Sequence, residues 1–404
     1  MASVSWFRTR WVRRIPIFFL IIVCVGGLTI LLVAPYLPRL LAEGYPAAVW
    51  PAPGSFAQLP GRAVEEPASQ PATGLPTSGK SLSRFEKDGG RALLVYRAGV
   101  LSVEHYAVGF GRETRFNSFS LAKSLVGALI LRAVSKGLIA SLDDPVGRYL
   151  PNIGDESFRS VPLLAFLRMR SGVMFSESGL KSASVPGNKA VEQVLVNPFG
   201  PMARLHMGGL SAVAEGLRAD PSIKDFSYQN INTAILGAVL EGVYRSDLQT
   251  ILSDEIWAPA GAADASWRQY DAQKPVSPYC CIYARSRDWV LVAAFLMKNG
   301  SVDAPFLRPD LWDRFFGRKV ALSDRQKGLY DLHLYQNVLD RAGEPLQGPF
   351  SYMFGSKGQT VYMMPDKDLV VVRFGDGLPL LHSTLYAAWR ALPKPTPGAV
   401  ATTR

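Results

Sequence analysis

Residues 120–136, Ser-Leu-Ala-Lys-Ser-Leu-Val-Gly-Ala-Leu-Ile-Leu-Arg-Ala-Val-Ser-Lys, are apolar on most faces of a helix drawn from Leu121 onward. The pattern predicts a buried helix, not an amphipathic helix on the surface. Ser120 and Lys123 stand three residues apart at its start and therefore project to the same side. A serine and a lysine at this spacing are more often part of a solvated helix face, but the apolar residues that follow favour a buried site.

This pair of residue types suits nucleophilic catalysis. A serine at a helix N-terminus gains from the helix dipole and from free backbone N–H groups, which stabilise a developing oxyanion. A lysine at the start of an apolar helix is partly desolvated, so it can be neutral often enough to accept the serine proton. The sequence contains no G-x-S-x-G motif, and none of its four histidines has a recognisable partner motif. Ser120 is therefore the candidate nucleophile and Lys123 its base.

Strand-like runs stand at both ends of the chain, with a helical region of about 145–270 between them. The runs form two predicted hairpins, 92–96 with 100–106 and 361–364 with 369–374, and further helices are expected at 232–243, 289–297 and 382–392. Strands at both ends of a domain with a helical middle suggest one sheet assembled from distant segments. The sequence therefore predicts an α/β fold of the α+β type, with one antiparallel sheet flanked by helices and a helical lobe.

The composition of the 404 residues bounds the class of protein. Hydrophobic residues make up 48% and charged residues 19%, which excludes a wholly disordered or collagen-like chain. The formal net charge is +11, but no stripe of basic and aromatic residues accompanies it, so we expect no nucleic-acid partner.

The cysteines and histidines give no support to a metal site. No C-x-x-C or H-E-x-x-H spacing occurs, and we expect neither a metal ion nor a cofactor. Three cysteines cannot form a disulfide framework. Because a disulfide between neighbouring cysteines is strained, we interpret Cys280 and Cys281 as two small buried thiols.

An apolar run near the N-terminus predicts a membrane anchor. Residues 17–34 carry no charge and would span about 27 Å as a helix, close to a bilayer core. Four arginines precede the run, at Arg8, Arg10, Arg13 and Arg14. The positive-inside rule then predicts a cytoplasmic segment at 1–14, a transmembrane helix in the lipid bilayer at 15–35, and an inner-membrane protein whose catalytic domain faces the periplasm or outside. A cleaved signal peptide is the alternative.

The remaining boundaries follow from composition. Residues 36–80 are rich in Pro, Ala, Gly and Ser and predict a linker, and 393–404 predict a flexible tail. The catalytic domain is expected at 81–392, with its helical lobe at about 145–270.

Two further segments accompany Ser120 and Lys123. Residues 226–232, Phe-Ser-Tyr-Gln-Asn-Ile-Asn, precede a predicted helix, and their asparagines could simply cap it. Residues 354–359, Phe-Gly-Ser-Lys-Gly-Gln, lead into a predicted strand, and could be a glycine-rich turn. Glycines there would let the backbone approach a substrate closely.

Together these segments resemble the serine β-lactamase-related hydrolases, which include class C β-lactamases and penicillin-binding proteins. Residues 226–232 match the F-x-Y-x-N-x-N segment of this superfamily, and further colinear matches lie at 141–151, 163–175 and 283–289. No K-T-G occurs, and the G-x-x-G-Q form at 355–359 is instead similar to the 6-aminohexanoate-dimer hydrolase branch. The resemblance implies a β-lactamase/transpeptidase-like fold with the active site between the sheet and the helical lobe.

The resemblance also implies roles for individual residues. Tyr228 would carry protons beside Ser120 and Lys123, and Asn230 would orient Lys123 or the substrate. The backbone N–H groups of Ser120 and Phe354 would hold the oxyanion, and the substrate strand would include Gly355, Gly358 and Gln359. The implied activity is hydrolysis of a small-molecule amide or ester through an acyl-enzyme on Ser120.

Two alternatives remain open at this point. One is a β-lactamase or D,D-peptidase, although those enzymes usually hold the substrate carboxylate with the lysine of K-T-G. The other is a non-catalytic relative that binds peptidoglycan or another acyl ligand. The sequence leaves the substrate and the oligomeric state undetermined.

Overall fold

The computed structural model describes residues 25–43, 55–62, 79–175, 197–301, 304–341, 344–377 and 382–391. Its centre is a seven-stranded antiparallel sheet of order β3-β2-β13-β12-β11-β10-β9. The strands are β2 (Gly90–Arg97), β3 (Val100–Tyr106), β9 (Leu329–Asp331), β10 (Leu334–Arg341), β11 (Glu344–Gly355), β12 (Gln359–Met364) and β13 (Leu369–Gly375). Both predicted hairpins are present, and the pairing of β13 with β2 joins the two ends of the domain.

Every residue of β12 and β13 is buried, because helices cover both faces of the sheet. Side chains alternate between faces along a strand. Val370 and Val372 belong to the large core shared with the helical lobe, whereas Val371 packs in the smaller cluster with Leu385 of the C-terminal helix. This two-sided burial explains why the sequence of these strands is a continuous apolar run.

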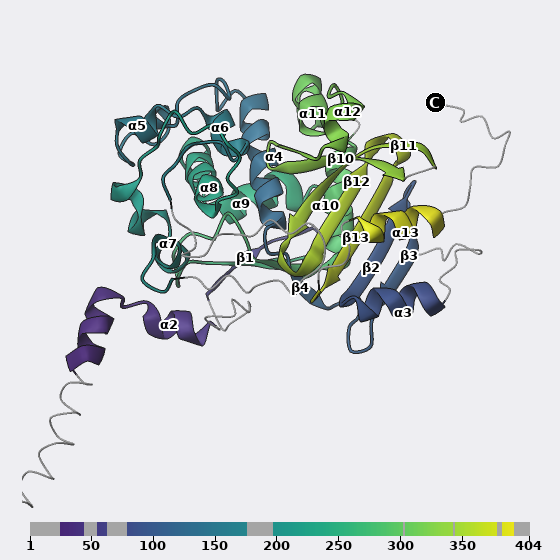
Figure 1. The fold of residues 1–404 in the computed structure, drawn as a ribbon, viewed down its shortest axis with the longest axis horizontal. Coiled ribbons are helices and arrows are strands. Elements are labelled where there is room, and N and C mark those ends of the chain that lie inside the picture. Colours follow the sequence, from purple (N-terminus) through teal and green to yellow (C-terminus); the bar gives the residue numbers. More distant parts are fainter. Residues whose placement is uncertain are drawn as a thin grey trace, which may run out of the picture.

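Helices surround the sheet and fill the lobe beside it. They are α2 (Leu37–Ala42), α3 (Gly79–Lys87), α4 (Leu121–Ser135), α5 (Glu156–Arg159), α6 (Leu163–Leu167), α7 (Pro201–Gly208), α8 (Asn230–Tyr244), α9 (Leu248–Leu252), α10 (Ser286–Met297), α11 (Pro309–Phe315), α12 (Leu322–Gln326) and α13 (Ser383–Ala391). Figure 1 shows α4 standing between the lobe of α5–α9 and the sheet. It packs on α8 on one side and on β11 and β12 on the other, so all its faces are buried.

A second sheet carries the chain into α4. It has four antiparallel strands in the order β1-β5-β6-β4, with β1 (Phe56–Leu59), β5 (Ala265–Arg268), β6 (Ile282–Arg285) and β4 (Arg115–Asn117). A two-stranded ribbon, β7 (Gly300–Ser301) with β8 (Ala304–Pro305), follows α10. The predicted α/β fold with its antiparallel sheet and helical lobe is therefore confirmed.

Parts of segment 36–80, which we expected to be an irregular linker, form regular elements. Residues of this segment make α2, β1 and the start of α3, and β1 pairs with β5 through Phe56 and Arg268. The predicted cytoplasmic segment 1–14 and the predicted tail 393–404 lie outside the described residues.

The predicted transmembrane helix at 15–35 is contradicted. Throughout the described ranges, the structure has no helix both long and apolar enough to cross a membrane. The predicted inner-membrane location and contact with the lipid bilayer rested on that helix and are corrected with it.

Candidate active site

Ser120 is placed by the short segment that connects β4 to α4. Ser118 binds Ile282 of β6 twice, through its backbone N–H (2.8 Å to the carbonyl) and through its Oγ, which accepts from the Ile282 N–H at 2.9 Å. Phe119 then adopts a φ of 46°, which is costly for a non-glycine residue, and its carbonyl accepts the N–H of Cys281 at 3.2 Å. The turn delivers a partly exposed Ser120 to the N-terminus of α4.

Lys123 lies one turn further along α4, directly behind the serine. Its side chain is 1% exposed, and its Nζ lies 2.9 Å from Ser120 Oγ. The same Nζ donates to the main-chain carbonyl of Tyr279, also at 2.9 Å. The structure thus brings the predicted nucleophile and base together, and a main-chain carbonyl that sequence reasoning missed fixes the position of the amine.

Tyr228 stands at the open side of this pair. Lys123 Nζ lies 5.0 Å from the centre of its ring, and 36% of the tyrosine is exposed. Tyr330 of β9 meets the Tyr228 ring edge-on, at 6.0 Å between centroids. Burial raises the pKa of Tyr330 well above its usual value of 10, and the neighbouring Tyr228 adds to the effect. Tyr330 is therefore a neutral aromatic neighbour of Tyr228.

The segment that carries Tyr228 is held by side chains of the helical lobe. Asn230 is the first residue of α8, and its Nδ2 lies 3.7 Å from the sulfur of Met202. Asn232 is buried, and its Oδ1 accepts the hydroxyl of Ser171 at 2.6 Å. The second asparagine of the motif thus ties two segments of the lobe together, in place of a simple helix cap.

The end of β11 packs against the turn that precedes Ser120. A Cβ atom at Gly355 would lie 2.5 Å from the carbonyl oxygen of Ser118 and 3.3 Å from the Cβ of Phe119. Only glycine permits this approach. The backbone around Phe354, which pairs with Thr360 of β12, therefore runs close beside the serine turn.

The turn after β11 is held from behind by β13. Gln359 is buried, and its side-chain amide exchanges two hydrogen bonds with the backbone of Gly375, at 2.7 and 2.8 Å. Arg373 donates to the carbonyl of Gly358 at 2.7 Å. Burial lowers the pKa of Arg373 to about 10, so it remains charged at neutral pH. Gln359 thus supports the predicted substrate strand from its rear, and Arg373 is a supporting residue that the sequence did not reveal.

Cys280 and Cys281 form a disulfide, so their interpretation as two thiols was wrong. The adjoining backbone is held firmly, with Trp267 Nε1 donating to the carbonyl of Cys280 at 2.9 Å. Both cysteines are buried directly after Tyr279, and this bridge lies in the loop that supports Lys123. Among the described residues, no group of three or more His, Cys, Asp or Glu is arranged to hold a metal ion.

Comparison with known proteins finds a matching family and a curated relative. The sequence profile of the Beta-lactamase family matches residues 82–392. The 6-aminohexanoate-dimer hydrolase of Paenarthrobacter ureafaciens is 26% identical over 183 residues, which is 44% of this chain and 44% of that protein. The match thus covers less than half the length of that relative.

Solved structures share the fold at low sequence identity. A structure from Bacillus anthracis, provisionally described as a 6-aminohexanoate-dimer hydrolase, has a TM-score of 0.64 and 18% identity over 83% of this chain and 89% of its own. A D-stereospecific amidohydrolase from Streptomyces has a TM-score of 0.56 and 16% identity, covering 78% of this chain and 98% of its own. A class C beta lactamase from Rhodobacter sphaeroides has a TM-score of 0.51 and 13% identity, with 78% and 97% covered.

Proposed function

We propose, from the premise that the chain belongs to the beta-lactamase family of serine hydrolases, that it cleaves a small amide or ester through an acyl-enzyme on Ser120. One observation carries the proposal: the amine of Lys123, 1% exposed, lies 2.9 Å from the hydroxyl oxygen of a solvent-accessible serine. That distance lies within the hydrogen-bond reach that proton transfer requires.

In the acylation step, Ser120 Oγ attacks the substrate carbonyl while neutral Lys123 accepts the hydroxyl proton. The tetrahedral intermediate then collapses, the bond to the leaving group breaks, and Lys123 with Tyr228 returns the proton to the departing amine or alcohol. Water enters, loses a proton by the same path and attacks the acyl carbonyl. This releases the acid and restores Ser120.

The oxyanion is assigned to the backbone N–H groups of Ser120 and Phe354. The first stands at the N-terminus of α4, where the helix dipole favours negative charge. The second belongs to the strand that packs on the turn before the serine, through the close contact of Gly355 with Ser118. Asn230, at the start of α8, is assigned to orienting Lys123 and the substrate.

The proposed substrates are short ω-amino-acid amides and related esters. Similarity to the 6-aminohexanoate-dimer hydrolase supports this class. The chain has no K-T-G sequence with which to hold a β-lactam carboxylate, which disfavours a β-lactamase or D,D-peptidase.

A covalent probe and a substrate screen test the proposal. The full chain should be labelled by a fluorophosphonate and should hydrolyse a nitrophenyl ester, and Ser120→Ala should abolish both. Ser124→Ala is the matched control, because it removes a buried hydroxyl from the next turn of α4 that donates to the His333 carbonyl at 2.6 Å. Activity of Ser120→Ala above about 1% of wild type would reject Ser120 as the nucleophile.

The same preparation would then be screened on 6-aminohexanoate dimers, D-amino-acid amides, acyl esters and a cephalosporin. Preferential turnover of the ω-amino-acid amides would support the proposed substrate class. Preferential turnover of the cephalosporin would favour the β-lactamase alternative. If the probe failed to label the wild-type protein, a non-catalytic binding module would be favoured.

A further inference from the structure

Residues 36–43 lie outside the region matched by the family profile, yet they pack on the catalytic domain. Leu40 of α2 is buried against Ala203 and Met207 of α7, with Tyr36 alongside. The hydroxyl of Tyr36 donates to the carbonyl of Pro198 at 2.9 Å. The segment is therefore docked by both apolar and polar contacts.

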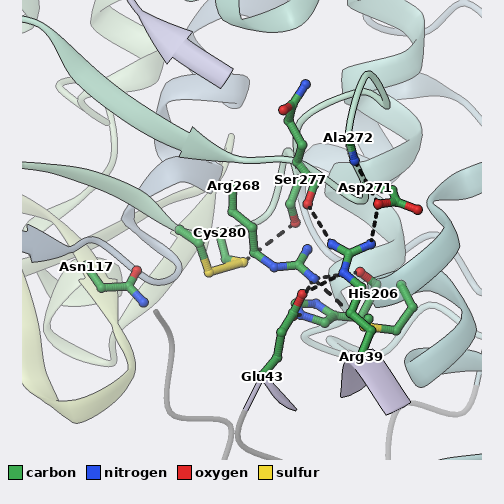
Figure 2. A network of polar contacts seen from close by, with 12 residues as sticks. Arg39, Glu43, Asn117, His206, Arg268, Asp271, Ala272, Ser277 and Cys280 are labelled. Carbon is green, nitrogen blue, oxygen red and sulfur yellow. Dashed lines mark hydrogen bonds and ion pairs between the residues drawn. A yellow bond between two sulfur atoms is a disulfide. The ribbon is translucent and has the colours of Figure 1, made fainter. Parts of the chain in front are cut away.

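At the end of α2 the chain buries a charge. Glu43 is 2% exposed, and its Oε2 lies 2.8 Å from Nη2 of Arg268, which is also 2% exposed. Arg39 binds the other carboxylate oxygen at 2.9 Å and reaches Asp271 at 3.2 Å. Figure 2 shows Arg39 and Glu43 meeting Arg268 and His206 in one cluster.

Tyr279 connects this cluster, through His206, to the proposed active site. His206 Nε2 lies 3.7 Å from Oε2 of Glu43, and its Nδ1 lies 3.2 Å from the hydroxyl of Tyr279. The main-chain carbonyl of Tyr279 accepts the amine of Lys123, whose Nζ also lies 5.6 Å from the centre of the Tyr279 ring. Tyr279 is 2% exposed, and it contacts the charge cluster through its hydroxyl and Lys123 through its main-chain carbonyl.

The protonation states suit a fixed arrangement. Burial alone would raise the pKa of Glu43, but the nearby imidazole of His206 and the bonded guanidinium of Arg268 outweigh that effect and lower it to about 2. Burial, together with the charge of Arg268, lowers the pKa of His206 to about 3. At neutral pH the imidazole is therefore uncharged. A proton on its Nε2 faces the carboxylate and leaves Nδ1 to accept the Tyr279 hydroxyl.

We propose that Glu43 is a positioning residue for the proposed hydrolysis: it holds Arg268 and His206 in place, and through Tyr279 it fixes the amine of Lys123 beside Ser120. The inference rests on the proposed function of Lys123 as the base. Without the carboxylate, the charge of Arg268 would be buried without its partner, and the cluster would have to rearrange. Tyr279 would move with it, and a displacement of about 1 Å can cost up to about a hundredfold in rate.

The test uses the full chain with Glu43→Gln, Tyr279→Phe and the double variant. Gln keeps the shape of the side chain and removes its charge, while Phe keeps the ring and the main-chain carbonyl but loses the hydroxyl that meets His206. We expect each single variant to lower kcat for a nitrophenyl ester about tenfold, with KM within about twofold. The double variant should be no slower than the slower single variant, because the two residues act in one chain.

The pH profile gives a second readout. Arg39, Arg268 and His206 contact Glu43, Tyr283 lies within its electrostatic reach, and Asp271 contacts Arg39. Lys123 faces Ser120, Tyr228, Tyr279 and, more distantly, His333. Loss of the Glu43 charge leaves the cluster more positive, which disfavours the protonated form of Lys123. The acid limb of the kcat/KM profile should therefore move to lower pH in Glu43→Gln.

Glu104→Gln is the matched control. Glu104 is 9% exposed and binds the buried Arg287 at 2.7 and 2.9 Å, and neither Tyr279 nor Lys123 takes part in these bonds. The Glu104→Gln variant should have lower thermal stability but an unchanged kcat and pH profile. A wild-type kcat and pH profile in Glu43→Gln, or an equal loss of kcat in Glu104→Gln, would overturn the inference.

Failure of the proposed function would be recognised separately, as absent turnover and absent labelling in the wild-type protein. In that case the position of the amine is followed by NMR of ¹⁵N-labelled Lys123, compared between wild type and Glu43→Gln across pH. A titration moved to lower pH in the variant would support the coupling of Glu43 to Lys123. Identical titrations would refute it.

Discussion

Replacement of Lys123 by arginine separates a base from a mere positive charge. A guanidinium keeps the charge and can still donate to the Tyr279 carbonyl and to Ser120 Oγ, both of which lie 2.9 Å from the native amine. It cannot give up its proton at any pH at which the protein is folded. If Lys123 is the base, Lys123→Arg should therefore be nearly inactive. Lys123→Met, which loses both charge and base, should be equally so.

The structure sets the size of the expected loss. General-base catalysis contributes about 10²–10⁴-fold, which corresponds to about 3–5 kcal/mol of transition-state stabilisation. Lys123 is 1% exposed, so the position that its amine fills behind Ser120 is closed to bulk water. We therefore expect the upper part of that range, about 10⁴-fold in kcat.

The assay is the rate of nitrophenyl ester hydrolysis from pH 5 to 10, together with the rate of fluorophosphonate labelling. Thermal unfolding of each variant shows whether the larger guanidinium has disrupted the fold. Lys123→Ala offers a check that does not depend on fit, because small alkylamines added to the buffer should restore part of the activity. If Lys123→Arg kept wild-type kcat and an unshifted pH profile, the lysine would be structural and the mechanism would have to be withdrawn.

Three further predictions test the surroundings of this pair. Tyr228→Phe should lower kcat by about 10²–10⁴-fold with little change in KM, because only the proton-carrying oxygen is lost; steady-state kinetics measures both. Gly355→Ala should lower the free energy of unfolding by about 1–3 kcal/mol, measured with urea, because the new Cβ would meet the Ser118 carbonyl at 2.5 Å. Burial lowers the pKa of His333 to about 3, so the folded state resists protonation, and stability is lost as pH falls from about 6.5 toward 3. His333→Gln should remove about 3 kcal/mol of the loss between pH 7 and pH 4, measured by urea unfolding at both values; equal pH dependence in the two proteins would contradict this assignment.

Local periodicity was enough to predict several of the regular elements. The predicted helix beginning at Leu121 is α4, and the two predicted hairpins are β2–β3 and β12–β13. These segments are apolar over most of their length. A long apolar run predicts a buried element from the local sequence alone. The segment 36–80 lacks such a run. Its short β1 exists because it pairs with β5, more than two hundred residues away.

The candidate site divides in the same way. Ser120 and Lys123 could be predicted as a pair because their spacing on a helix is local. In the structure, Lys123 Nζ lies 2.9 Å from Ser120 Oγ. The partner that fixes the lysine is the main-chain carbonyl of Tyr279, 156 residues away. Every residue has such a carbonyl, so no residue type could have marked it. The disulfide of Cys280 with Cys281 was missed for another reason, since a general expectation of strain was applied to a loop whose shape the sequence does not reveal.

Long-range charge compensation is the least visible of these features. Glu43 and Arg268 are separated by 225 residues, and in the sequence each is one charged residue among many. Their burial shows the relation between them, because a carboxylate in contact stabilises the charge of an arginine that is 2% exposed, and the fold supplies that carboxylate from a segment outside the family match. Relatives that lack the N-terminal segment would have to neutralise this position differently or place an uncharged residue there. The support of the proposed base, Lys123, can therefore differ between members of the family.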